Sequence, residues 1–229
     1  MDETLRHLRR FRSQGVSELV LTPHLLAADL AVSAMDEVLA LHRERFGEVL
    51  DAVGEDPAFH RLSLGQEVLA RTPGDVEKVV GRPDVGLAGG PALLVDLGLD
   101  QPFDGDGVVQ RVVAEGRMLI IAHPERYDFG QDDAVEVVTR WRDRGALLQI
   151  NGGSPADLYT PAASSLAKRF LEEGVVDMVC TDHHGDFRSH DPGMIAETLA
   201  PLTGSESVEL LMGQGPRRVL PASAARSVA

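Results

Sequence analysis

Residues 119–127 read Leu-Ile-Ile-Ala-His-Pro-Glu-Arg-Tyr, and this stretch decides the fold. A short apolar run stops abruptly at a histidine, a proline and two charged residues. Helical patterns lie on both sides of the run, which is typical of a buried strand in a parallel sheet. In α/β enzymes the chemistry gathers where such strands end. A strand that leads into a charged turn at the surface would explain this cluster equally well. The choice between the two interpretations therefore depends on the rest of the sequence.

Six stretches have the character of strands, and most alternate with helical patterns. They cover residues 17–22, 62–68, 92–96, 117–122, 146–151 and 176–181. Helices are expected along an apolar stripe from Met35 to Val53 and over 2–14, 73–81, 106–115, 131–144, 161–174, 192–202 and 205–213. Because alternating strands and helices produce parallel strands, the sequence predicts an α/β fold whose sheet is open or closed into a barrel.

Composition and charge restrict the class of protein. The 229 residues are 43% hydrophobic, which suits one domain, expected over 1–220 with a frayed tail over 221–229. The formal net charge of −14 argues against a protein that binds nucleic acid through basic patches. The single cysteine excludes an internal disulfide, and the sequence has no signal peptide and no long apolar run. We therefore expect a cytoplasmic protein without membrane insertion.

Ionisable side chains recur at the ends of the expected strands. Five of the six strands end in or contain one, namely His24, Glu67, Asp96, His123, and Asp182 with His184. In a barrel these strand ends meet on one face. Imidazoles and carboxylates without cysteine suit Zn, Mn or Fe, and ligands from several strands can hold two or three ions. The alternative is a ring of surface charges on loops.

Three other side chains are interpreted as structural. Cys180 lies within an apolar strand, which predicts a buried, inert thiol. It is not followed by the Cys-x5-Arg loop of cysteine-based tyrosine phosphatases, because residue 186 is an aspartate. Trp141 is expected in the core, and His42 lies in an apolar helical stripe as a core or boundary residue.

Several short motifs occur in the order seen in the PHP (polymerase and histidinol phosphatase) superfamily. They are Thr-Pro-His at 22–24, Gly-Gln-Glu at 65–67, Val-Asp at 95–96, Ala-His-Pro-Glu-Arg-Tyr at 122–127 and Thr-Asp-x-His at 181–184. The fourth motif, with Gly-Ala-Leu-Leu-Gln-Ile-Asn at 145–151, resembles bacterial CpsB/CapC-type tyrosine-protein phosphatases of capsule and exopolysaccharide synthesis. The resemblance implies a distorted barrel of seven βα units, a trinuclear metal cluster and hydrolysis of phosphotyrosine, notably on bacterial tyrosine kinases.

The resemblance also implies roles for individual residues. The metal ligands would be His24, Glu67, His123, Asp182 and His184, with Glu67 bridging two ions. Arg126 matches an arginine that holds the phosphate, with Glu125 as a supporting neighbour. Arg188 matches a second such catalytic arginine, although it lies one place nearer to the Asp-x-His motif than usual.

The sequence departs from the family pattern at three places. Asp96 stands where a glutamate ligand is usual, and Leu25 follows His24 where many members have a second polar residue. The family's opening strand, with its Asp-x-His-x-His motif, does not precede residue 1. We therefore expect a barrel that lacks its first strand and two ligands, and that is marginally stable unless it oligomerises. A truncated or regulatory form and a histidinol-phosphatase-like phosphoesterase remain alternatives.

Overall fold

The computed structural model describes residues 1–54, 56, 61–185 and 191–222. Within them, six parallel strands form one sheet in the order β2-β4-β5-β6-β7-β8, and β1 pairs with β3 in parallel beside it. The strands are β1 (Leu19–Leu21), β2 (His24–Leu25), β3 (Leu62–Leu64), β4 (Glu67–Leu69), β5 (Ala92–Asp96), β6 (Met118–Ala122), β7 (Ala146–Asn151) and β8 (Met178–Cys180). The expected α/β class with a parallel sheet is confirmed.

Two sheets form because neither chain segment continues as a strand from the first pair, β1 with β3, into the second pair, β2 with β4. The strand expected over 17–22 ends at Leu21, and β2 begins after Thr22–Pro23, whereas the single strand expected over 62–68 is interrupted at Gly65–Gln66. Proline cannot donate a backbone hydrogen bond. A Cβ at Gly65 would lie only 2.7 Å from Cδ2 of Leu87, so the backbone approaches Leu87 as only glycine can. Beyond the break, the pairing of β2 with β4 sets His24 opposite Glu67.

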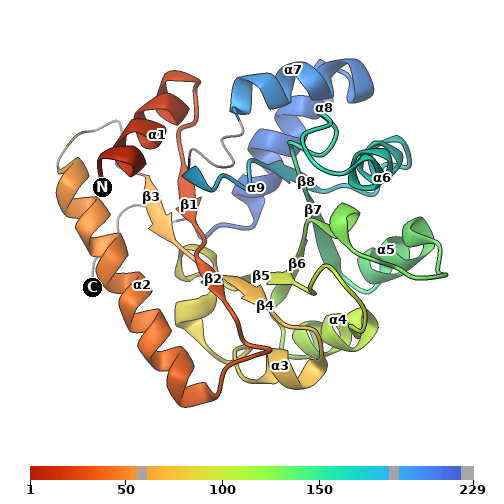
Figure 1. Cartoon of the computed structure of the whole chain (residues 1–229), viewed down its shortest axis with the longest axis horizontal. Coiled ribbons are helices and arrows are strands. Elements are labelled where there is room, and N and C mark those ends of the chain that lie inside the picture. The colour runs from red at the N-terminus through yellow and green to blue at the C-terminus, as the bar shows by residue number, and fades with distance from the viewer. Residues whose placement is uncertain (55, 57–60, 186–190, 223–229) are drawn as a thin grey trace.

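Helices surround the strands on the outside (Figure 1). They are α1 (Asp2–Ser13), α2 (Val32–Val53), α3 (Pro73–Glu77), α4 (Gly105–Ala114), α5 (Ala134–Asp143), α6 (Pro161–Glu172), α7 (Pro192–Thr203), α8 (Ser205–Glu209) and α9 (Gly215–Arg218). All the expected helices are found, but 73–81 is shorter, and 205–213 changes to a π-helix over Leu210–Gln214. Side-chain caps at Asp104, Asp133 and Thr160 fix the starts of α4, α5 and α6.

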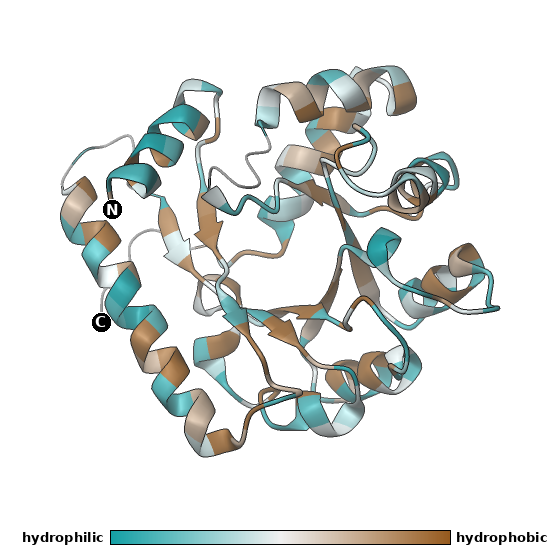
Figure 2. Cartoon of the chain, in the orientation of Figure 1, coloured by the Kyte–Doolittle hydropathy of each residue, from teal (hydrophilic) through white to brown (hydrophobic). Residues whose placement is uncertain are grey.

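The central strands are buried on both faces. Leu119 and Ile121 of β6 pack against the helices, whereas Ile120 and Ala122 face inward. Figure 2 shows the apolar residues concentrated on the strands and the inner faces of the helices. Trp141 is 1% exposed and lies in the core between the sheet and α5, as predicted. Each fully buried side chain of this size contributes about 1.5–3 kcal/mol to folding.

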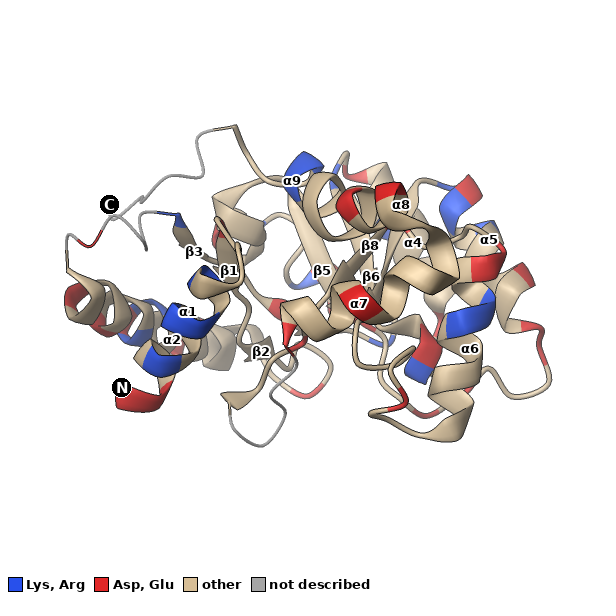
Figure 3. Cartoon of the chain, turned by 90° about the horizontal axis from the view of Figure 1, so that it is seen from above, with Lys and Arg blue, Asp and Glu red and all other residues tan. Residues whose placement is uncertain are grey.

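Charged residues lie on the outer helices. Figure 3 shows short basic segments, such as that of α1, interspersed with acidic ones. Two carboxylic residues are buried among the described ones: Glu67, at 6% exposed, and Glu125, at 2%. None of the described helices has both the length and the apolarity needed to cross a bilayer.

Candidate metal centre

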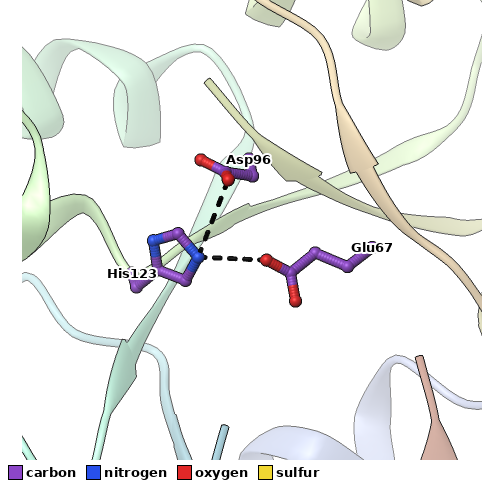
Figure 4. Close-up of side chains that lie close together, drawn as sticks. All are labelled: Glu67, Asp96 and His123. Atoms are coloured by element: carbon purple, nitrogen blue, oxygen red, sulfur yellow. Dashed lines mark hydrogen bonds and ion pairs between the residues drawn. The ribbon is translucent and has the colours of Figure 1, made fainter. Parts of the chain in front are cut away.

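Three of the expected ligands meet where β5 and β6 end. Glu67 opens β4, Asp96 closes β5 and His123 follows β6. Nε2 of His123 lies 3.0 Å from Oε1 of Glu67 and 4.0 Å from Oδ2 of Asp96. Figure 4 shows the three side chains pointing toward one another. We call these residues the inner group. Because β4, β5 and β6 are adjacent in the sheet, strand pairing brings them together.

The inner group is a buried cluster of charges. The side chains of His123 and Glu67 are 5% and 7% exposed. Burial lowers the pKa of His123, but the hydrogen bond to Glu67 and the charge of Asp96 outweigh it, so that pKa is raised from its usual value. A buried carboxylate is strongly unfavourable without such a partner. In this structure His123 is the partner of Glu67.

Two of the expected ligands have strained backbones. His123 has φ +36° and Asp182 has φ +47°, which is the left-handed region that favours glycine. His123 follows the central strand β6, and Asp182 follows the edge strand β8, at points where the chain leaves the strand in a sharp turn. The backbone N–H of His123 donates to the carbonyl oxygen of Gln149 over 2.7 Å, which holds the turn against β7. Strain of this kind persists where the surroundings enforce it, and it concentrates at functional sites.

The other expected ligands form a second set, which we call the outer group: Asp182, His184 and His24. Nε2 of His184 lies 2.8 Å from Oδ1 of Asp182, and the rings of His24 and His184 stack with centroids 5.3 Å apart. Both imidazoles are exposed, whereas the Asp182 carboxylate is 6% exposed. Since His24 lies opposite Glu67, the outer group borders the inner one.

Three donors surround the second carboxylate oxygen of Asp182. Nδ2 of Asn151 and the hydroxyl of Tyr159 approach Oδ2 to 2.5 Å and 3.1 Å, and Nη1 of Arg126 lies 3.5 Å from it. Arg126 thus faces the outer group. Asn151 and Tyr159 were not predicted. The available signal was that β7, alone among the expected strands, ends in an amide and no ionisable group.

Glu125 is a buried residue that links the inner group to the outer group. It is 2% exposed, and its Oε1 accepts hydrogen bonds from the backbone N–H of Asn151 over 3.0 Å and from Oγ of Ser154 over 2.7 Å. Burial raises the pKa of Glu125, and its nearness to His123 only partly opposes this. Glu125 lies two residues after His123 and accepts from the backbone of Asn151, whose side chain in turn donates to Asp182. The supporting position expected for Glu125 agrees with these contacts.

Comparison with known proteins identifies the family. The model of the family of capsular polysaccharide synthesis, CpsB/CapC, matches residues 1–221. The chain belongs to the CpsB/CapC family. A solved structure from a study of YwqE from Bacillus subtilis and CpsB from Streptococcus pneumoniae, described as metal-dependent tyrosine phosphatases, has a TM-score of 0.76 and 20% identity. The match covers 100% of this chain and 92% of that chain, and it confirms the CpsB-type fold.

A second solved structure is less similar. It is a glycerophosphoryl diester phosphodiesterase from Parabacteroides distasonis, with a TM-score of 0.35, 16% identity, and coverage of 87% of this chain and 55% of that one. A similarity this low carries no argument about fold or function. No curated protein matches the chain.

The inner group of this CpsB/CapC chain fits a divalent metal ion. Its three donor atoms, one from each residue, lie within 4.8 Å of one another. Two donors on one ion, each at about 2.1 Å, lie roughly 3–4 Å apart, which matches the separations around His123. Nitrogen and carboxylate donors without a thiolate suit Mn, Fe or Zn. Arg188, the second expected catalytic arginine, lies outside the described residues.

Proposed function

We propose that this chain is a metal-dependent phosphatase that removes phosphate from phosphotyrosine in proteins. Its substrate would be a bacterial tyrosine kinase that controls capsule or exopolysaccharide synthesis, and it would act in the cytoplasm. One domain over 1–220 would carry two or three ions of Mn, Zn or Fe, held by the inner and outer groups. The convergence of Glu67, Asp96 and His123 in a CpsB/CapC chain carries the proposal.

Each group of the site has a task in phosphomonoester hydrolysis. When bound, divalent ions lower the pKa of a coordinated water and neutralise charge on the phosphate oxygens. Arg126 would bind the phosphoryl group, because a planar guanidinium can donate to two of its oxygens at once. Its side chain is 17% exposed, and its ion pair with Asp182 is long, at 3.5 Å, so its N–H groups would remain available to a phosphate. Asp96 would complete the inner ion's ligands despite its shorter side chain.

The structure disfavours a cysteine nucleophile. Desolvation raises the pKa of the Cys180 thiol to about 12, and the charge of Asp182 adds to the shift. A thiol with that pKa is almost wholly protonated at neutral pH, and only the thiolate is a good nucleophile. Cys180→Ala should therefore leave the rate of phosphotyrosine hydrolysis within about twofold of the wild type. A loss of activity on this substitution would point to a cysteine mechanism.

The proposal is tested by measuring phosphotyrosine hydrolysis in the wild type and in two arginine variants. We expect the chain with Mn²⁺ to hydrolyse a phosphotyrosine peptide, and a chelator to abolish this rate. Arg126→Ala should lower kcat/KM by about 100-fold with bound metal unchanged, the scale for a lost charged contact to a transition state. Arg140→Ala is the matched control, since Arg140 pairs with Asp106 on the outer helices.

Two results would contradict the proposal. If histidinol phosphate were hydrolysed much faster than phosphotyrosine, the chain would be a phosphoesterase of the histidinol-phosphatase type. If Mn²⁺ bound but no phosphomonoester were hydrolysed, the chain would be a metal-binding regulatory protein. Equal loss of metal and activity in Arg126→Ala would instead make Arg126 structural.

A further inference from the structure

We infer that Tyr159 is a positioning residue that acts on two partners with two different parts of its side chain. Its hydroxyl orients Asp182, and the face of its ring orients Arg126. The inference rests on the proposed function, because it concerns how the metal ligand and the phosphate-binding arginine of that function are held. The contacts described for Tyr159 are with Asn151, Asp182 and Arg126, all outside the inner group.

The hydroxyl acts on the carboxylate of Asp182. It donates to Oδ2 over 3.1 Å and also lies 3.2 Å from Nδ2 of Asn151, which reaches the same oxygen. These donors occupy Oδ2, whereas Oδ1 faces the imidazole of His184. The hydroxyl therefore helps to aim one defined oxygen of Asp182 at the position where His184 also points. Hydrogen bonds that orient a ligand in this way commonly change metal affinity by about 10- to 100-fold.

The ring acts on the guanidinium of Arg126. Cζ of Arg126 lies 4.8 Å from the centroid of the Tyr159 ring, within the range of a cation–π contact. The ion pair of Arg126 with Asp182 is long, at 3.5 Å, and involves only Nη1, whereas the ring lies against the central carbon of the guanidinium and so constrains its plane. A phosphate bound by both amino groups needs that plane fixed. The ring supplies this without competing for the N–H donors.

The loop that carries Tyr159 is itself anchored. Oγ of Ser154 donates to Glu125, and Oγ of Ser164 in α6 donates to the carbonyl oxygen of Ser154 over 2.7 Å. Tyr159 directly precedes Thr160, whose side chain accepts from the backbone of α6 and caps this helix. Both ends of the 152–160 loop are thus fixed to the site or to α6, so Tyr159 is presented in a defined orientation.

Two substitutions separate the hydroxyl from the ring. Tyr159→Phe removes only the hydroxyl, and we expect the affinity for Mn²⁺ to fall about tenfold, with phosphate affinity and KM within about twofold of the wild type. Tyr159→Leu also removes the aromatic face, and we expect the dissociation constant of inorganic phosphate and KM to rise a further three- to tenfold. Calorimetry with Mn²⁺ and with phosphate on the Mn²⁺-loaded chain measures both.

Two controls exclude a merely structural effect. Tyr127, the other tyrosine, donates to the carbonyl oxygen of Ala122 and accepts from the backbone of Leu97, so Tyr127→Phe should lower the melting temperature without changing phosphate affinity. In an Arg126→Ala background, Tyr159→Phe and Tyr159→Leu should bind phosphate equally, because the ring then has no guanidinium to orient.

The outcomes separate this inference from the proposed function. If both Tyr159 variants bind Mn²⁺ and phosphate as the wild type does, or if the wild type binds no Mn²⁺, the inference is overturned. If Tyr159→Leu weakens phosphate binding equally with and without Arg126, the ring does not act through Arg126. A wild-type chain that binds Mn²⁺ and phosphate but hydrolyses no phosphotyrosine overturns the proposed function alone, since the binding measurements still decide the role of Tyr159.

Discussion

The inner and outer groups of the site are held by different means. The inner group comes from three adjacent strands in the middle of the sheet, and the His123–Glu67 pair is almost wholly buried. The outer group comes from β2 and from the residues after β8, the two edges of the sheet order, and two of its three side chains are exposed. Strand pairing positions the first group, whereas hydrogen bonds between side chains position Asp182 and His184 of the second. Substitutions in the two groups should therefore affect stability and function in different proportions.

The largest effect on stability is expected at the inner group. His123→Ala leaves Glu67 as a buried carboxylate without its imidazole partner. Breaking a buried charged pair from one side costs about 3–5 kcal/mol, so the free energy of unfolding in the presence of a chelator should fall by roughly that amount. Urea denaturation measures it. A double variant, His123→Ala with Glu67→Leu, should recover part of the loss, and a single-variant loss below about 1 kcal/mol would contradict the burial argument.

The next largest effect is expected at the residue that links the groups. Glu125→Ala leaves the N–H of Asn151 and the hydroxyl of Ser154 without their acceptor. Each unsatisfied buried group costs about 1–3 kcal/mol, so we expect a loss of about 2–4 kcal/mol together with weaker Mn²⁺ binding through Asp182.

Glu125→Gln is the matched control for that experiment. It keeps a side-chain oxygen acceptor and resembles the neutral carboxyl that burial favours, so its loss should stay within about 1 kcal/mol. If the glutamine variant were as unstable as the alanine variant, the negative charge of Glu125 would matter more than its acceptor.

The sequence predicted the inner group better than the contacts around the outer one. Glu67, Asp96 and His123 are ionisable residues at apolar strands, and parallel strands bring such positions together. Asn151 and Tyr159 carry no charge at neutral pH and interact with Asp182, 31 and 23 positions further along the chain. The amide at the end of β7 marks Asn151 as unusual, but it does not indicate the distant partner, which only the folded chain shows.

The same limit explains the strand that was predicted too long. Residues 62–68 show a pattern compatible with one strand, yet the structure breaks it at Gly65–Gln66, where Leu87 lies against the glycine. That contact joins segments more than twenty positions apart, so it cannot be read from local periodicity. The predicted fold class was nevertheless correct, because the strand order depends on the alternation of strands and helices and not on the single interruption at 65–66.

A smaller effect on stability is expected at the outer group. His184 is exposed and hydrogen-bonds only through its ring to Asp182 among the contacts described for it, apart from its stacking on His24. His184→Ala should therefore change the free energy of unfolding of the metal-free chain by less than about 1 kcal/mol. It should nevertheless weaken Mn²⁺ binding and slow phosphotyrosine hydrolysis. If His184→Ala lost as much stability as His123→Ala, the two groups would not differ in how they are held.

The smallest effect is expected where α1 is fixed beside the outer group. The ring of Phe11 packs on His183, which lies between Asp182 and His184 of the outer group, and Arg10 binds Asp191 at the start of α7 over 2.7 Å. Arg10 is 48% exposed, so the pair contributes about 0.5–1 kcal/mol. Asp191→Asn removes the charge but keeps an N-cap, because asparagine also accepts from the first turn of α7.

The pH dependence of the stability lost in Asp191→Asn shows whether the ion pair with Arg10 is responsible. Desolvation raises the pKa of Asp191, but the hydrogen bonds from Arg10, Gln14 and the backbone of α7 outweigh it and lower that pKa overall. A depressed carboxyl pKa stabilises the fold above the unfolded value, near 4, and the contribution is lost as pH falls through the folded value. The wild type should thus exceed Asp191→Asn by a constant amount between about pH 5 and 7, and the difference should shrink at lower pH. Arg10→Met should show the same profile, and a difference independent of pH would assign the loss to the cap instead.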